Sequence, residues 1–275
     1  DDERKSADTL PELNLDHSNI HEFKDKALNY YIQLVGGNDE RGKNLAKVAL
    51  GYTFYHMFAE ELYNANDING HTVMMYIHGP KGSGKTTYFG TIFQAFWGMQ
   101  NIEILSSSVS IPAIENKMGD YSNLGISLDE FDPEHSSIRL NNFNGWYHLA
   151  SRTVSDTNRT RKNKFTPIRS TLTVLSNFMI NENKDQADAT ISRFVYFKYI
   201  KDYRSKESKY FNFFQKNMEE LSRITSYMLL NQTQKDRNEI KDKVETLTES
   251  MSKQLDATAK DNPIYEVEHR ITDNY

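Results

Sequence analysis

The sequence contains no cysteine and no long apolar run, and both absences restrict what the protein can be. Without cysteine, the 275-residue chain has no disulfide, no thiolate metal site and no cysteine nucleophile. No segment approaches the roughly 18 consecutive apolar residues that a membrane-spanning helix needs, and no secretory signal opens the chain. We therefore expect a protein of a reducing intracellular compartment that makes no use of a membrane.

Zinc-binding histidine motifs and a general excess of positive charge are also absent. The eight histidines form neither H-x-x-x-H nor H-E-x-x-H, so nothing supports a catalytic zinc ion. The net charge of −5 argues against a chain coated in nucleic acid, so any DNA contact must come from a local basic cluster. The first residue is Asp1 rather than Met, which suggests a piece of a longer polypeptide.

Apolar patterning divides the chain into three zones. Residues 1–68 are expected to form a helical N-terminal segment, a possible oligomerisation collar, and residues 202–275 a C-terminal helical lid or tail. Between them, residues 69–201 alternate short apolar runs with helical stretches, which predicts a mainly parallel sheet with helices on both faces. The expected strands are 72–78, 102–105, 124–131, 170–177 and 193–199. Helices are expected over 20–35, 42–64 and 211–230.

A glycine-rich loop follows the first expected strand. The segment GPKGSGKT, residues 79–86, fits G-x-x-x-x-G-K-[ST] in full and stands between a strand and a helix. In such a loop, backbone N–H groups and the helix N-terminus converge on phosphate oxygens. Lys85 is expected to reach the β- and γ-phosphates of ATP, and the Thr86 hydroxyl to bind Mg²⁺. The residues predicted to hold the ATP phosphates are Gly79, Pro80, Lys81, Gly82, Ser83, Gly84, Lys85, Thr86 and Thr87.

Two later strands end in polar side chains that suit ATP hydrolysis. The first, ISLDEFD, contains Asp129, which can hold the Mg²⁺ shell, and Glu130, which can polarise the attacking water. Adjacent carboxylates on a regular strand point to opposite sides, so the two can take different roles. The second, TLTVLSN, ends in Asn177. Because the carboxyl ends of parallel strands meet at the ligand crevice, Asn177 is expected to orient water near the γ-phosphate.

These three motifs, in this order, resemble those of superfamily 3 helicases, which are AAA+-like ring ATPases of viruses, phages and mobile elements, including primase-helicases. The resemblance covers residues 72–199. It implies an α/β P-loop NTPase (AAA+-like) core with a mainly parallel five-stranded sheet, flanked by N-terminal and C-terminal helical segments. It also implies a ring, expected to be a hexamer, that translocates on DNA from 3′ to 5′ during replication of such an element. The expected location is then the cytoplasm of a bacterial host or the replication compartment of a virus-infected cell.

A basic segment lies between the acidic strand and the Asn177 strand. Residues 152–169 hold six basic side chains and one acidic side chain around a turn-capable centre, which suggests a β-hairpin. By the resemblance, this hairpin projects into the ring channel and grips the backbone of single-stranded DNA, as a translocating motor requires. The residues expected to contact DNA are Arg159, Arg161, Lys162 and Lys164. The alternative is a solvated charged loop.

Arg193 precedes the last expected strand, in the segment TISRFVYFKY. Members of the family carry an arginine near this place that reaches the γ-phosphate held by the neighbouring subunit, so the resemblance implies that Arg193 is the arginine finger. Many relatives have a paired Arg-Arg where this chain has Ser192 and Arg193. A sensor within the same subunit and a cap on the strand therefore stay open as alternatives.

Four functions share the expected nucleotide site. The leading one is an ATP-driven DNA helicase or translocase, with Lys85, Asp129, Glu130, Asn177 and Arg193 as its catalytic residues and ATP and Mg²⁺ as its cofactors. The alternative is an AAA+ helicase loader or initiator-type switch without unwinding activity. A monomeric small-molecule kinase and a degenerate ATP-binding scaffold are the remaining two. A primase or an origin-binding domain outside this chain is a further expected partner.

Overall fold

A computed structural model of the protein describes residues 14, 20–37, 39–55, 74–121, 124–147, 152–155, 163–166, 170–180, 190–199, 209–230, 239 and 242. Its helices are α2 (His21–Gly36), α3 (Glu40–Tyr55), η2 (Thr86–Thr91), α5 (Ile92–Phe96), α6 (Ile111–Asp120), α7 (Leu140–Tyr147), α9 (Lys209–Lys216) and α10 (Met218–Leu230). Its strands are β1 (Met74–His78), β2 (Ile104–Ser106), β3 (Gly125–Phe131), β4 (Arg152–Ser155), β5 (Asn163–Thr166), β6 (Thr171–Ser176) and β7 (Phe194–Lys198).

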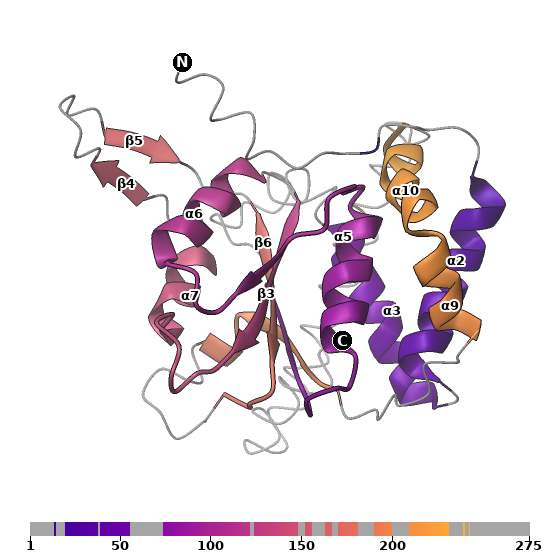
Figure 1. The fold of residues 1–275 in the computed structure, drawn as a ribbon, viewed down its shortest axis with the longest axis horizontal. Helices are drawn as coiled ribbons and strands as arrows, with labels where there is room; N and C mark the ends of the chain where they lie inside the picture. Colours follow the sequence, from indigo (N-terminus) through magenta and orange to yellow (C-terminus); the bar gives the residue numbers. More distant parts are fainter. Residues whose placement is uncertain are drawn as a thin grey trace.

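Five of the strands form one sheet in the order β2-β3-β6-β1-β7. Every neighbouring pair in it is parallel, which confirms the predicted α/β P-loop architecture. Helices α6 and α7 lie on one side of this sheet, and α5, α3, α2, α9 and α10 lie on the other (Figure 1). Because both faces are covered, the central strands are buried on both sides, and every residue of β1 and β6 is buried.

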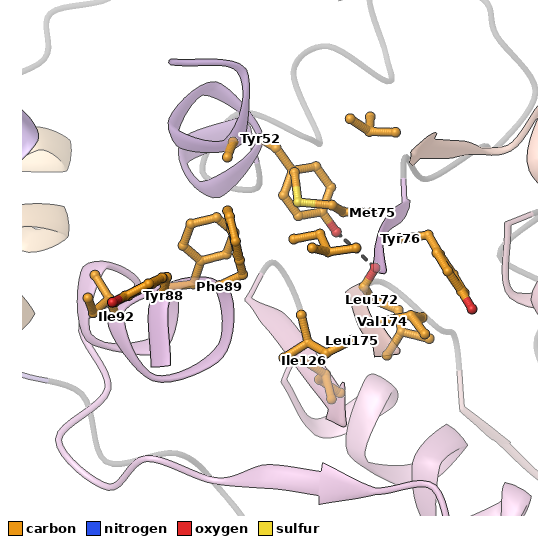
Figure 2. Close-up of a cluster of buried hydrophobic side chains, with 14 of the residues drawn as sticks. Tyr52, Met75, Tyr76, Tyr88, Phe89, Ile92, Ile126, Leu172, Val174 and Leu175 are labelled. Atoms are coloured by element: carbon orange, nitrogen blue, oxygen red, sulfur yellow. Dashed lines mark hydrogen bonds between the residues drawn. The ribbon is translucent and has the colours of Figure 1, made fainter. Parts of the chain in front are cut away.

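The core lies between the sheet and the helix that follows the phosphate loop. Figure 2 shows residues of β1, β3 and β6 packed with Tyr88, Phe89 and Ile92. Trp97, at the end of α5, lies so close to Gly125 that a Cβ there would be 2.2 Å from its ring. The Trp97 indole also donates a 2.7 Å hydrogen bond to the Thr53 carbonyl of α3. The N-terminal helices are therefore packed into the same core as the sheet.

The turn between α2 and α3 depends on two glycines. Helix α2 ends at Gly36, and Gly37 has a φ of 62°, which glycine adopts without strain. Gly36 also approaches the next helix closely, because a Cβ there would be 2.5 Å from the Lys43 backbone nitrogen. The expected helix stop at these glycines is present, and the second helix begins at Glu40.

The C-terminal apolar stretch forms two helices rather than the one helix predicted over 211–230. The break falls at Asn217, between α9 and α10. The Asn217 amide side chain donates a 2.6 Å hydrogen bond to the Phe213 carbonyl, and its own carbonyl accepts from the Leu221 N–H at 3.0 Å. Because asparagine satisfies free backbone groups at helix ends, it ends one helix and begins the next.

Strands β4 and β5 form a separate antiparallel pair, with Val154 opposite Lys164. In Figure 1 this pair projects beyond α6, away from the helices on the far side of the sheet. Among the described residues, no helix combines the length and apolar character needed to span a bilayer.

Candidate ATPase site

The phosphate loop connects β1 to η2 at the carboxyl edge of the sheet. Gly82 and Gly84 have φ values of 79° and 91°, a region that side chains with a Cβ rarely adopt. Gly79 is constrained differently, because a Cβ there would be 1.9 Å from the Tyr199 carbonyl oxygen. The glycines thus permit both the curl of the loop and its close approach to the neighbouring chain segment.

Lys85 is held at the sheet edge by oxygen acceptors. Its ammonium donates to the carbonyls of Gly79 at 2.8 Å and Pro80 at 2.9 Å, and to the Asn177 side-chain oxygen at 3.0 Å. Burial lowers the pKa of Lys85, and the Asp129 carboxylate opposes that shift. The lysine and the asparagine, 92 positions apart in the chain, therefore meet as their places at the ends of β1 and β6 predict.

The threonine of the loop and the first acid of β3 also meet. The Thr86 hydroxyl donates a 2.6 Å hydrogen bond to one Asp129 carboxylate oxygen. A hydroxyl and a carboxylate oxygen are hard ligands, which fit Mg²⁺. The described residues contain no group of three or more acidic, histidine or cysteine side chains that could hold a metal by themselves.

Glu130 occupies a bulge in β3 with an unusual backbone conformation. Leu128 pairs with Val174 and Phe131 with Ser176, so β3 has one more residue than β6 between these pairs. Glu130 has a φ of 57° and is the only non-glycine residue with positive φ in the described part of the chain. The regular alternation assumed for Asp129 and Glu130 therefore does not hold, because Glu130 itself has a left-handed conformation within the bulge.

Three hydrogen bonds hold this bulge. The Glu130 N–H donates to the Asp129 carboxylate at 2.8 Å, while the Glu130 carbonyl accepts from the Ser107 hydroxyl at 2.8 Å. The Ser107 N–H donates to the Asp129 carbonyl at 3.1 Å. The sequence analysis does not identify Ser107. Its position just after β2, the strand that neighbours the acidic strand, could have indicated a contact with that strand. Glu130 is exposed and directly follows Asp129 in the strand.

The backbone around Asn177 is also fixed by side chains. The buried Ser176 hydroxyl donates to the Phe131 carbonyl at 2.6 Å and accepts from the Phe178 N–H at 2.9 Å. The Tyr76 hydroxyl of β1 donates to the Phe178 carbonyl at 2.9 Å. These bonds connect β1 with the ends of β3 and β6, so the backbone at Asn177 is held in a defined position.

Arg193 lies at the amino end of β7, at the edge of the sheet opposite the phosphate loop. It precedes β7, whose first residue pairs with Met74 and whose last residue pairs with His78, next to the phosphate loop. Since β7 has five residues rising about 3.3 Å each, Arg193 is about 17 Å from the loop of its own subunit. Its guanidinium lies 5.4 Å from the centre of the Tyr147 ring. This placement disfavours the alternative of a sensor for the nucleotide of its own subunit.

The remaining predicted contacts are placed only in part. Within the loop, Lys81 is exposed and Ser83 is buried. Of the expected DNA contacts, Arg159, Arg161 and Lys162 lie outside the described residues, and Lys164 lies on β5.

Comparison with known families identifies the class of the protein. The sequence matches the profile of the AAA domain family over residues 65–262, and the chain belongs to this family. Family membership supports nucleotide binding and an ATPase function, and it is consistent with the resemblance to superfamily 3 helicases. No curated protein matched the sequence.

Two solved structures are similar to this chain at low sequence identity. The active helicase Cch of SCCmec type IV is 15% identical with a TM-score of 0.51, over 95% of this chain and 47% of that one. The A-form apo structure of the NrS-1 C-terminal region is 12% identical with a TM-score of 0.46, over 84% of this chain and 48% of that one. The chain thus spans about half the length of these two structures. At 15% identity, the likeness to Cch shows the fold alone.

Proposed function

We propose that this chain is the ATP-driven motor domain of a DNA helicase or translocase that serves the replication of a virus, phage or mobile element. The observation that carries the proposal is the meeting of Lys85, Asp129 and Asn177 at one sheet edge, beside the phosphate loop. AAA family membership and a fold shared with the Cch helicase support it. The corresponding location is the cytoplasm of a bacterial host or the replication compartment of a virus-infected cell.

The proposed reaction is attack of water on the γ-phosphate of ATP. Lys85 neutralises charge on the β- and γ-phosphates, and the loop N–H groups hold the oxygens. Thr86 and Asp129 would hold Mg²⁺, which would withdraw charge from the phosphate oxygens. Glu130 accepts a proton from the attacking water, and Asn177 orients that water. The exposed Glu130 and the fixed backbone before Asn177 support these two roles.

The proposed DNA contact is the β4–β5 pair and the basic residues that follow β4 in sequence. Its projection beyond α6 supports a hairpin that extends from the ATPase core (Figure 1). We infer that Arg159, Arg161, Lys162 and Lys164 contact the DNA backbone, and that movement of the hairpin during hydrolysis drags the strand. A backbone grip of this kind carries no sequence specificity and weakens with salt.

We further infer that the motor is a ring, with hexamer as the proposed stoichiometry, in which Arg193 acts on the ATP of the neighbouring subunit. The placement of Arg193 at the sheet edge opposite its own phosphate loop supports action between subunits. A mixing assay tests this inference. Arg193→Ala and Lys85→Ala are each expected to be inactive, whereas their mixture regains ATPase activity because some interfaces combine an intact loop with an intact arginine. A mixture as inactive as its parts would contradict action between subunits.

Strand separation tests the leading function against its alternatives. The full-length protein is expected to unwind a tailed duplex with ATP, and Lys85→Ala and Glu130→Gln are expected to stop unwinding. Lys216→Ala is the control, because Lys216 is an exposed lysine of α9, outside the phosphate loop, and the variant should unwind normally. Hydrolysis stimulated by DNA without strand separation would instead identify a helicase loader or initiator-type switch. Phosphate transfer to a metabolite without any response to DNA would identify a kinase.

A further inference from the structure

A buried tyrosine of the N-terminal segment contacts the helix that follows the phosphate loop. Tyr31, on α2, has no exposed surface, and its hydroxyl donates a 3.1 Å hydrogen bond to the Tyr88 carbonyl. Burial raises the pKa of Tyr31 well above its ordinary value, so the hydroxyl keeps its proton and serves as a donor. Its ring packs edge-to-face against Phe96 of α5 and Phe214 of α9. Tyr31 is therefore a fixed link between the outer helices and the ATPase core.

The acceptor lies in an unusual turn. Residues Thr86–Thr91 form a π-helix that starts directly after Lys85, and the Ile92 N–H bonds to the Thr87 carbonyl, five residues back. Such wide turns are rare, and they occur most often at functional sites. The turn contains Thr86 and Thr87, two of the residues expected to contact ATP or Mg²⁺.

The same turn places the Tyr88 ring against the phosphate loop. A Cβ on Gly84 would be 2.4 Å from the Tyr88 ring, so the glycine and the ring are in close contact. The Tyr88 N–H also donates to the Gly84 carbonyl at 2.8 Å. A shift of the Tyr88 backbone must therefore move either the Tyr88 ring or the phosphate loop at Gly84 that the ring contacts.

We propose that Tyr31 is a positioning residue for nucleotide binding: its hydroxyl holds the π-turn open and thereby holds Tyr88 beneath Gly84. This inference rests on the proposed nucleotide site. Without the hydroxyl, the turn can return to the ordinary α-helical pattern. Because successive residues of an α-helix differ in direction by about 100°, a register change of one residue would turn Thr86 by up to about 100°. Helix α2 is then part of the nucleotide-binding machinery, and contacts made by α2 alter nucleotide affinity.

The chain supplies a matched control in a second buried tyrosine. Tyr52, on α3, donates a 3.0 Å hydrogen bond to the Leu172 carbonyl of β6, and Figure 2 shows this contact. Tyr52 is 5% exposed and comes from the same helical segment, but Leu172 lies near the amino end of β6, at the edge opposite the phosphate loop. Replacing either tyrosine by phenylalanine removes one buried hydroxyl and leaves one core carbonyl without that donor.

The test compares nucleotide affinity and thermal stability in Tyr31→Phe, Tyr52→Phe and Lys85→Ala, with a fluorescent ATP analogue and Mg²⁺ as the probe. Both tyrosine variants should lose stability, and Tyr52→Phe at least as much as Tyr31→Phe, because the Tyr52 hydroxyl also bonds to the Thr171 hydroxyl at 3.2 Å. Only Tyr31→Phe should bind the analogue more weakly, by about fivefold, the factor that one net hydrogen bond represents in an equilibrium constant. Equal affinity of the two tyrosine variants would overturn the inference while leaving the nucleotide site intact. Unchanged affinity in Lys85→Ala would instead overturn the nucleotide site itself.

Hydrogen exchange of the unmodified protein gives a second test that does not depend on a variant folding. Binding of the analogue should slow amide exchange in α2 near Tyr31, because a fixed π-turn restrains the helix bonded to it. Exchange in α3 near Tyr52 should change much less. Equal protection of both helices, or protection of neither, would refute the proposed link.

Discussion

Replacement of Glu130 by asparagine should stabilise the protein while removing its ATPase activity. Glu130 adopts a φ of 57°, a left-handed conformation that costs a residue with a Cβ roughly 1–2 kcal/mol. Asparagine adopts this conformation several times more often than most residues, because its short side chain bonds locally. We therefore expect that glutamate stands here, despite its unfavourable backbone conformation, because the reaction needs its carboxylate.

Glu130→Gln is the comparison that isolates the backbone effect. Both variants remove the carboxylate, and both keep the backbone bonds to Asp129 and Ser107, which do not involve the Glu130 side chain. They differ in how well the residue accepts positive φ. The asparagine variant should therefore exceed the glutamine variant by about 1 kcal/mol in the free energy of unfolding, or by roughly 2–4 °C in Tm.

Calorimetry and steady-state ATPase measurements on the two variants test this reasoning. Both variants should hydrolyse ATP at least about a hundredfold more slowly than the native protein, since general base catalysis contributes that much. The Tm of Glu130→Asn should be higher than that of Glu130→Gln. If the two melt together, or if asparagine melts lower, the bulge is not strained and the argument for a functional constraint at this residue is refuted.

Two further predictions concern the loop and the strand before it. Gly79→Ala should prevent folding, because its Cβ would meet the Tyr199 carbonyl at 1.9 Å, whereas Gly82→Ala should fold with a Tm lower by a few degrees, since its Cβ meets open space and only its φ of 79° is unfavourable. Soluble yield and calorimetry distinguish these outcomes. Burial lowers the pKa of His78 to about 4, helped by Lys198 and Lys85. Since the unfolded chain binds this proton near its ordinary pKa of 6.5, stability should fall with acidification, by about 2 kcal/mol between about pH 7 and about pH 5. Urea unfolding of His78→Gln should lack this part of the loss, and an unchanged pH profile would show that His78 titrates normally.

Much of the sheet and the meeting of its polar ends could be predicted from the sequence. The central strands are covered on both faces and hold mostly apolar side chains, so their positions are visible as short hydrophobic runs. The site follows from strand order, since Lys85, Asp129 and Asn177 each stand at the carboxyl end of a strand or just beyond it. Local spacing was sufficient for these features because each depends on one strand and the turn that follows it.

Other features depend on contacts between distant segments, and local spacing does not reveal them. The bulge at Glu130 requires β2 and β6 on either side of β3, with Ser107 bonded to its backbone. The hydroxyl of Tyr31 reaches a carbonyl 57 positions away, and an apolar helical pattern gives no sign of that acceptor. The helix break at Asn217 was missed for another reason, because the apolar pattern continues across the cap and only the side-chain bonds mark it.

Mg–ATP binding to the native protein, Lys85→Ala and Lys81→Ala, measured by calorimetry, is the sharpest test of the proposed nucleotide site. The sheet edge that holds Lys85, Asp129 and Asn177 is expected to bind the phosphates of one ATP molecule. A charge-assisted bond from Lys85 predicts affinity about tenfold or more weaker in Lys85→Ala, while the exposed Lys81 predicts a loss of less than about fivefold. Absence of binding by the native protein, or equal affinity in Lys85→Ala, would refute the site.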